Sequence, residues 1–169
     1  MYYIELDLAK IQKHGKEKRD ENFDFRSFLK SQDTDNVDNL VHQLYKEISE
    51  KIDCTNCGNC CVELKPLLTE KDIEKIAQRV GITPQEIIDT DTERDDGQYY
   101  FKALPCVFLN DKKCSIYDDR PHECMSYPFL HKKDIITRLW GVVDNYSICP
   151  IVYNVYEQLK YKLKKDNYA

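Results

Sequence analysis

The chain has 169 residues and a formal net charge of −5, and 41% of its residues are hydrophobic while 33% are charged. That length suits one domain with its own core, and that composition excludes a disordered tract. The mildly acidic balance argues against a broad basic surface, so no nucleic-acid partner is expected.

The first thirty residues are charged and weakly patterned, which predicts a peripheral arm available to a protein partner. Residues 1–13 alternate apolar with charged positions and show neither a basic leader nor a small-residue cleavage site. The most apolar stretches, 135–143 and 148–155, are shorter than the roughly 18 residues that span a bilayer. A cytoplasmic protein without membrane contact is therefore expected.

Helical spacing begins at residue 37 and follows good N-cap residue types at positions 33–35. This pattern predicts an amphipathic helix that leads directly into the first cysteine. Thr69 with Asp72 marks the start of a second helix that ends near Gly81, and Thr83 marks the start of a third. The apolar positions of the first helix are Val37, Leu40, Val41, Leu44, Ile48 and Ile52.

The second half of the chain predicts short strands, an exposed loop and one last helix. Residues 91–97 are acidic and rich in breakers, so the loop is expected there. Aromatic and aliphatic residues in 99–109 precede a turn at 110–113, which predicts a hairpin. The β-branched segment 135–143 favours a strand, although a helix fits the same pattern. Residues 152–163 predict a final amphipathic helix.

Cysteine placement is the strongest chemical signal. Four of the eight cysteines lie within eight residues, and in a reducing compartment such clustering indicates metal ligation rather than disulfide bridging. Thiolate is the ligating form of cysteine, and a Cys-x2-Cys turn directs successive sulfurs toward one point. The other interpretations are small buried apolar cysteines, and disulfides if the protein is exported. The candidate metal ligands are Cys54, Cys57, Cys60, Cys61, Cys106, Cys114, Cys124 and Cys149.

The first three of these cysteines have the spacing that holds three corners of a bacterial ferredoxin cluster, whose fourth ligand is a remote Cys-Pro such as Cys149-Pro150. The match is partial, because Cys61 follows Cys60 directly. Adjacent side chains tend to diverge, which predicts two sites. One site takes Cys54, Cys57, Cys60 and Cys149, and the other takes Cys61, Cys106, Cys114 and Cys124. Zinc and iron-sulfur clusters both accept four thiolates, so the metal stays open.

Three residues near the later cysteines are candidates for supporting the metal or a bound cofactor. Arg120 would offset thiolate charge or brace Asp118 or Asp119, and a turn-stabilising surface arginine is an equal alternative. Tyr117 and Tyr127 have phenols that could donate to sulfur or substrate, although packing against a small core explains them as well.

Three motifs together resemble a known family. The run Cys54-x2-Cys57-Gly58-x-Cys60-Cys61 is followed by Leu68-Thr69-x2-Asp72-Ile73, and then by Cys106-x-Phe108-Leu109-x4-Cys114-x-Ile116-Tyr117-x2-Arg120-Pro121-x2-Cys124-x2-Tyr127-Pro128. Over roughly residues 53–150 this arrangement resembles the CxxCxxCC (YkgJ-like) cysteine-cluster proteins. The resemblance implies a zinc- or iron-chelating domain in which the matching cysteines bind the metal. The chain also resembles the cysteine-rich part of flagellin lysine methylases, which implies that such a module can accompany methyl transfer.

These patterns predict an α+β fold with a small cysteine-rich, metal-organised core and a short hairpin, flanked by amphipathic helices. The expected divisions are an arm and helix over 1–52, a metal-binding domain over 53–150 and a C-terminal helix over 151–169 that packs on the same domain. The expected function is chelation of zinc or iron, with an iron-sulfur cluster as one form. The alternative is an iron-sulfur-dependent redox or protein-modifying, methyltransferase-like enzyme, or its accessory subunit.

Overall fold

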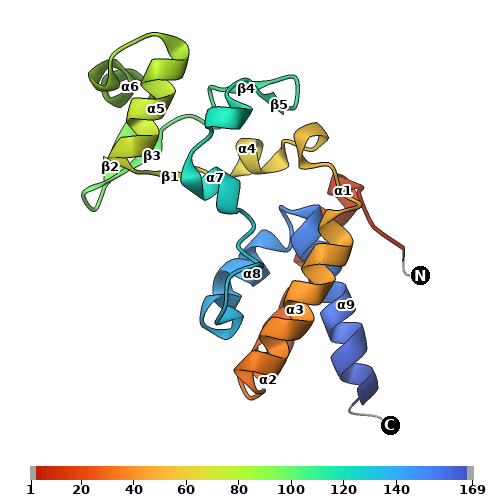
Figure 1. Ribbon diagram of the computed structural model, residues 1–169. Helices are drawn as coiled ribbons and strands as arrows, with labels where there is room; N and C mark the ends of the chain where they lie inside the picture. Colours follow the sequence, from red (N-terminus) through yellow and green to blue (C-terminus); the bar gives the residue numbers. More distant parts are fainter. Residues whose placement is uncertain (1–2, 167–169) are drawn as a thin grey trace. The chain divides into compact units, whose positions relative to one another are not determined.

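A computed structural model describes residues 3–166, with side chains through residue 163 (Figure 1). The described chain is mostly helical with two small antiparallel sheets, which confirms the predicted α+β class. It forms two compact units: the helical unit, Met1–Asp53 with Pro128–Ala169, and the cysteine unit, Cys54–Tyr127. The division into 1–52, 53–150 and 151–169 stays a prediction, while the structure groups 128–150 with the terminal helices.

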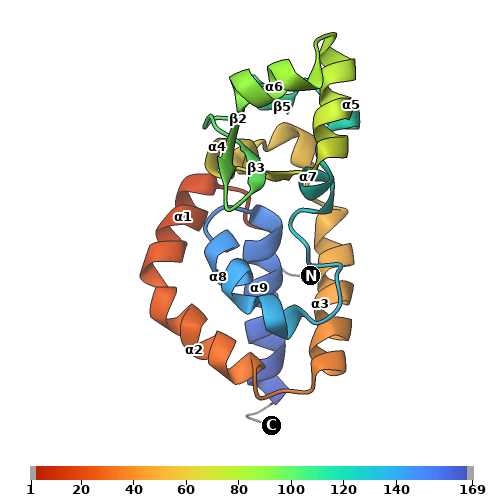
Figure 2. The same cartoon turned by 90° about the vertical axis from the view of Figure 1, so that its left-hand side faces the viewer.

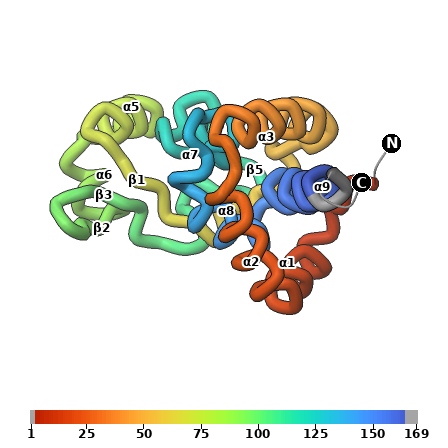
Figure 3. The backbone as a smooth tube through the Cα atoms, turned by 90° about the horizontal axis from the view of Figure 1, so that it is seen from below, coloured from red at the N-terminus to blue at the C-terminus, as the bar shows by residue number. Residues whose placement is uncertain are grey.

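The helical unit packs α9 between two groups of helices. Its elements are α1 (Leu8–Glu17), α2 (Arg19–Leu29), α3 (Thr34–Ser49), the 3-10 turn η3 (Ile135–Arg138), α8 (Leu139–Asn145) and α9 (Pro150–Asp166). Helix α3 runs along one side of α9, and α1 and α2 lie on its other side (Figure 2, Figure 3). No helix in the part of the chain that the structure describes is long and apolar enough to cross a membrane.

The predicted peripheral arm is wrong, because α1 and α2 belong to the core of the helical unit. Ile11, Phe25 and Leu29 are at most 5% exposed, and the Phe25 ring packs edge-on against Tyr156 with ring centroids 5.3 Å apart. These apolar positions are spaced too widely to show a clear helical stripe in the sequence alone. Their burial against α9 stabilises a segment whose intrinsic signal is weak.

The strand favoured for residues 135–143 is also wrong, since the segment forms η3 and α8. Ile135, Leu139 and Val143 recur every fourth residue and are all buried, which is the stripe of a helix. The buried Asp38 carboxylate on α3 accepts hydrogen bonds from the amides of Asp134 and Ile135 at 2.6 and 2.9 Å. This contact satisfies the first turn of η3, so tertiary capping overrides the β-branched propensity.

A buried polar network ties α9 to the N-terminal helices. The Glu157 carboxylate accepts hydrogen bonds from Lys18 at 2.5 Å, Lys160 at 2.9 Å and the Tyr146 hydroxyl at 2.9 Å. Lys160 is only 4% exposed and also lies 3.2 Å from Glu21. Burial alone would favour the neutral acid, but these donors outweigh it and hold the pKa of Glu157 below its usual value.

Acid is therefore expected to weaken the helical unit through Glu157. A folded-state pKa below the unfolded value gives stability that is present above the unfolded pKa, about 4.3, and is lost as the pH falls further. Glu157→Gln should cost about 1 to 3 kcal/mol at neutral pH and flatten this acid dependence. Urea unfolding between pH 7 and pH 3 measures both effects. The exposed control Glu17→Gln, whose nearest cation is 3.7 Å away, should leave the pH profile unchanged.

The cysteine unit combines short helices with two small sheets. Its elements are η1 (Cys54–Asn56), α4 (Asn59–Glu63), β1 (Leu67–Leu68), α5 (Glu70–Val80), α6 (Pro84–Asp91), β2 (Thr92–Asp95), β3 (Gln98–Phe101), β4 (Leu109–Asn110), β5 (Lys113–Cys114), η2 (Tyr117–Asp119) and α7 (His122–Ser126). The first sheet has the order β1-β3-β2, and β4 pairs with β5 in the second. The core is apolar and is formed by Leu68, Ile73, Ile76, Ala77, Ile87, Phe101 and Ile116.

Local sequence signals in the cysteine unit are largely confirmed. Capping boxes begin α5 at Thr69 and α6 at Thr83, and Gly81 ends α5 with a φ of 78°. The predicted hairpin is present, with Leu109 opposite Cys114. The loop expected at 91–97 is wrong for residues 92–95, because β2 pairs there with β3 and Asp96 and Gly97 make the turn. The backbone pairing with an aromatic strand outweighs the breaker-rich composition.

Candidate metal centre

The structure places seven of the eight candidate cysteines in the cysteine unit, on four separate segments. Cys54 lies in η1 and is exposed, Cys57 follows it, and Cys60 and Cys61 lie in α4. Cys106 lies in the loop after β3, Cys114 in β5 and Cys124 in α7. Cys149 belongs to the helical unit, where it is 7% exposed. All eight are thiols.

Four of these thiols form an electrostatically connected group, the thiol quartet of Cys61, Cys106, Cys114 and Cys124. Burial raises the pKa of Cys124 to about 12, and the charges of the other three members add to the rise. Burial likewise raises the pKa of Cys106 to about 11, with contributions from Cys61 and Cys114. A negative charge on one thiol disfavours ionisation of a neighbouring thiol, which is the direction of these contributions.

Cys60 and Cys61 are in direct contact in spite of being adjacent in the sequence. A thiol-thiol hydrogen bond to Cys60, together with burial, raises the pKa of Cys61 far above its usual range. Cys60 therefore links the exposed start of the motif to the thiol quartet. The contact between Cys60 and Cys61 runs against the predicted divergence of these two side chains. The predicted grouping of Cys61 with the three later cysteines stays a prediction.

Backbone hydrogen bonds hold the segments of the thiol quartet together. The Cys106 amide donates to the Cys61 carbonyl at 2.7 Å, which fixes the loop after β3 against α4. The Leu109 amide donates to the Cys106 carbonyl at 2.9 Å, and Ser115 donates to Phe108 at 2.8 Å. These bonds place Cys106 and Cys114 at one end of the β4-β5 hairpin, where both pack against the apolar core.

Gly58 is required where α4 begins. Its φ of 62° lies in the left-handed region, and an added Cβ would stand 2.6 Å from the Lys112 carbonyl oxygen in the β4-β5 turn. Only a residue without a side chain lets the start of α4 approach this turn so closely. The glycine thus brings the CxxCxxCC run against the hairpin that carries Cys114.

Gly58→Ala is expected to destabilise the cysteine unit by about 1 to 3 kcal/mol, because it adds both backbone strain and a steric clash. Gly97→Ala is the matched control, since Gly97 has a φ of 78° but open space around its Cβ position. Its cost should be about 1 kcal/mol or less. Thermal unfolding of the two variants measures the difference in stability. Equal losses of stability would show that the close approach of Gly58 to Lys112 contributes nothing to the cost of Gly58→Ala.

Two carboxylates position Cys124, and sequence reasoning assigned them no role at the site. Asp72 is 8% exposed and accepts hydrogen bonds from the Thr69 amide and hydroxyl and from the His122 amide, the last at 2.9 Å. Glu123 accepts a hydrogen bond from the Leu67 amide at 2.9 Å. Together they tie α7 to β1 and to the start of α5. The capping box signalled Asp72, but nothing local signalled its bond to His122.

The predicted supporting residues occupy different positions. The Arg120 guanidinium lies 3.8 Å from the centre of the Tyr117 ring and donates to the Tyr117 carbonyl. Its charge lowers the pKa of Cys114, opposing the rise that burial causes. Asp119 lies 3.5 Å from Lys75 and Arg79 rather than being braced by Arg120. Tyr117 is exposed and Tyr127 half-buried, so their roles at the site stay predictions.

The donor set of the thiol quartet suits a soft or borderline metal. Four cysteines are the usual ligands of closed structural zinc sites and of iron-sulfur clusters. Among the described side chains, through residue 163, no three His, Cys, Asp or Glu groups lie close enough together to hold a metal ion. A metal complex of the thiol quartet therefore requires its sulfurs to approach one another further than they do in the described structure.

The fold is α+β, and its cysteine unit carries seven cysteines on four segments. Cys106 and Cys114 pack against its small apolar core. Residues 53–149, more than half of the chain, match the CxxCxxCC family, described as "Putative zinc- or iron-chelating domain". The chain belongs to this family, which confirms the resemblance drawn from its motifs. No curated protein and no solved structure matches it.

Proposed function

We propose that the protein chelates zinc or iron through the thiol quartet. The observation that carries this proposal is that the charges of Cys61, Cys106 and Cys114, which come from segments far apart in sequence, all add to the rise in the pKa of Cys124. Four neighbouring thiolates are stable only when a cation offsets their charge. A divalent ion supplies that charge and displaces the thiol protons, so binding releases protons and strengthens as the pH rises.

The remaining thiols suggest a second role for the start of the motif. Cys54, Cys57 and Cys60 keep the ferredoxin spacing, and the Cys57 amide donates to the Cys54 carbonyl at 3.2 Å in a tight turn. This spacing favours an iron-sulfur cluster as the form in which iron is held. In that case the protein would serve as a redox or protein-modifying, methyltransferase-like enzyme or its accessory subunit. The assignment of Cys149 to this group stays a prediction.

Two further expectations belong to the proposal. A cytoplasmic location suits thiolate ligands, because a reducing compartment keeps them out of disulfides. A protein partner would meet the exposed side chains of Tyr3 and Leu6 ahead of α1, which are 77% and 55% exposed. Exposed apolar side chains of this size are common contact residues at interfaces, whereas the apolar residues of α1 and α2 are used within the unit.

Metal analysis with an ultraviolet-visible spectrum tests the proposal on protein purified without oxygen from cells supplied with iron and zinc. At least one equivalent of bound zinc or iron is expected. Visible absorption with sulfide would identify a cluster, and zinc alone would identify a closed thiolate site. Protein without either metal, and unable to take up Zn²⁺ or Fe²⁺ afterwards, would contradict the proposal.

Cysteine variants then separate the two groups of thiols. Cys61→Ser and Cys124→Ser should each weaken binding at the thiol quartet by at least tenfold, because each removes one of four thiolate ligands. The combined variant Cys54→Ser, Cys57→Ser, Cys60→Ser should keep one tightly bound ion. If that combined variant loses all metal while Cys124→Ser keeps it, the ligands lie in the other group.

A further inference from the structure

Two thiols of the CxxCxxCC run are in direct contact, which suits oxidation chemistry as well as metal binding. The side chains of Cys60 and Cys61 form a thiol-thiol hydrogen bond in α4. Both residues are half-buried rather than buried, so a small solute reaches them. We propose that this dithiol is a reversible oxidation site, at which a hydroperoxide converts the two thiols into a disulfide between Cys60 and Cys61.

The hydroperoxide alone balances this reaction. One sulfur attacks the terminal oxygen, the O–O bond breaks, and a sulfenic acid and an alcohol form, the alcohol taking up the first thiol proton. The second sulfur then attacks the sulfenic sulfur, the S–S bond forms, and water leaves with the second thiol proton. The two sulfurs lose two electrons and the hydroperoxide gains them. A second thiol already in contact traps the sulfenic acid before further oxidation.

The backbone of α4 makes this disulfide strained and therefore reversible. Adjacent Cα atoms lie about 3.8 Å apart across a trans peptide, below the roughly 4.4 to 6.8 Å that is usual for disulfides. The peptide between Cys60 and Cys61 also donates to the Gly58 carbonyl at 3.0 Å and accepts from the Leu64 amide at 2.9 Å. Closing the ring turns this peptide, so both hydrogen bonds open. Strained disulfides are readily reduced, so small thiols restore the dithiol.

Oxidation would also remove one member of the thiol quartet. The Cys61 sulfur leaves the set of thiolate ligands when it enters a disulfide. The Cys61 carbonyl accepts the Cys106 amide at 2.7 Å, so turning Cys61 also loosens the loop that carries Cys106. A bound ion would therefore be released as the disulfide forms. This consequence rests on the proposed function, whereas the disulfide itself requires no metal.

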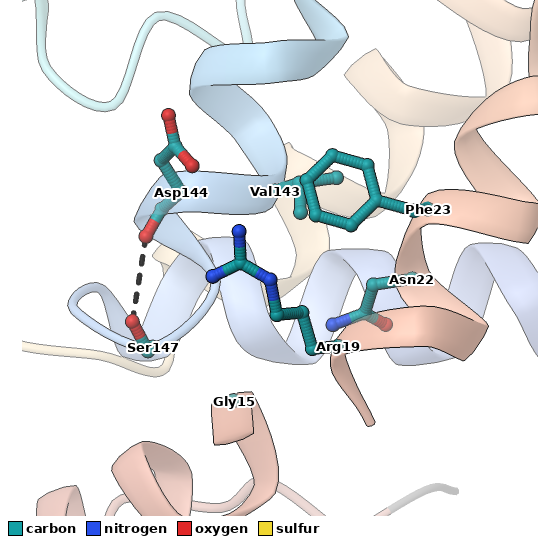
Figure 4. A pocket seen from close by; sticks show the side chains of 7 residues that line it. All are labelled: Gly15, Arg19, Asn22, Phe23, Val143, Asp144 and Ser147. Atoms are coloured by element: carbon teal, nitrogen blue, oxygen red, sulfur yellow. Dashed lines mark hydrogen bonds between the residues drawn. The ribbon is translucent and has the colours of Figure 1, made fainter. Parts of the chain in front are cut away.

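The helical unit provides the internal reference, because its thiol is less accessible to the oxidant. Cys149 belongs to this unit and is only 7% exposed. Figure 4 shows the small cavity of the unit, about 130 Å³ in volume, whose lining residues include neither cysteine nor methionine. A hydroperoxide that enters this cavity therefore meets no sulfur in its walls. Oxidation of Cys60 and Cys61 ahead of Cys149 is the expected order.

Differential labelling of the full chain, purified without oxygen, tests the site. After an equimolar amount of tert-butyl hydroperoxide, free thiols take a first alkylating label, and thiols released by reduction take a second. Tandem mass spectrometry of the tryptic peptide 52–71 locates the labels. The second label is expected on Cys60 and Cys61, and the first on the other cysteines of this peptide and on Cys149. Glutathione added before alkylation should return the first label to both oxidised residues.

Two variants and an unfolded sample show whether the contact decides the result. Cys60→Ser should leave the first label on Cys61, whose partner sulfur is gone, while the matched control Cys54→Ser should keep the disulfide between Cys60 and Cys61. In urea the contact is lost, and the second label should move to the Cys-x2-Cys pairs, which close with less strain. The same label pattern in folded and unfolded protein, or sulfinic acid in place of the disulfide, would overturn the proposal.

A colorimetric metal indicator in the same experiment separates this proposal from the proposed function. Release of bound metal in step with the disulfide is expected, and metal that stays bound after oxidation would overturn the link to the thiol quartet. Protein that holds no metal from the start would contradict the proposed function, and the labels on Cys60 and Cys61 would still decide whether the dithiol is an oxidation site.

Discussion

Removing bound zinc or iron with a strong chelator is expected to unfold much of the cysteine unit. Structural zinc contributes on the order of 10 kcal/mol to the folding of small zinc peptides, which exceeds the effect of any single substitution considered above. The reason lies in the fold: the apolar core of this unit has seven buried residues, and the thiol quartet joins four of its segments. Metal binding and folding are then the same equilibrium.

Hydrogen exchange on metal-loaded and stripped protein measures this effect residue by residue. Protection should be lost at the amides of Cys106, Leu109 and Ser115, whose hydrogen bonds hold the segments of the thiol quartet. The amides of α3 and α9 provide the internal control, because they belong to the helical unit and should keep their protection. Adding back Zn²⁺ or Fe²⁺ should restore the lost protection. Unchanged exchange after complete stripping would show that metal does not organise this unit.

Much of the fold was predictable wherever a local signal sufficed. Asp33 caps α3 by accepting a hydrogen bond from the Asn36 amide at 2.9 Å, as its residue type indicated. Each capping box, at Thr69 and at Thr83, lies within four consecutive residues. The sequence pattern alone therefore predicts it. The β4-β5 hairpin was also predictable from a local signal, its turn residues at 110–113. Two of these, Asp111 and Lys112, adopt positive φ in the structure.

The errors arose where distant contacts decide the local structure. The weak pattern of the first thirty residues conceals two helices that gain their stability by packing on α9. The segment 135–143 has strand propensity, yet Asp38 on a helix nearly a hundred residues earlier caps it as η3. Propensity is a weak prior compared with a buried hydrogen bond, and no single-sequence pattern reports a partner that far away.

The candidate site, too, was predictable where the signal is local and not where distant contacts decide. Spacing alone indicated which residue type would bind a metal, and the count of eight suggested two groups of four. The division into these two groups stays a prediction. In the structure, burial raises the pKa of Cys106 and Cys124, and the charges of Cys61 and Cys114 add to both rises. The carboxylates of Asp72 and Glu123 were not assigned to the site, because their partners lie 50 and 56 residues away in the chain.

Asp72→Ala is expected to cost about 3 to 5 kcal/mol, the range for removing a buried charged acceptor and leaving its donors unpaired. Three donors lose their partner: the Thr69 amide, the Thr69 hydroxyl and the His122 amide. Burial opposes the charge on Asp72, but these bonds outweigh it and hold the pKa of Asp72 below its usual value. The carboxylate therefore stabilises the folded state as an anion. Urea unfolding at neutral pH measures the stability that is lost when Asp72→Ala removes it.

Glu86→Ala supplies the matched control, since Glu86 closes the equivalent capping box on α6 at an exposed position, and its carboxylate bonds only Thr83 within the described part of the chain. Its cost should be much smaller than that of Asp72→Ala. The two variants should also differ in metal affinity, because Asp72 holds the start of α7, which carries Cys124, whereas α6 carries no cysteine. A weaker metal complex in Asp72→Ala with an unchanged one in Glu86→Ala would connect the long-range bond to the site. Equal changes in stability and metal affinity in both variants would show that Asp72 acts only as a helix cap.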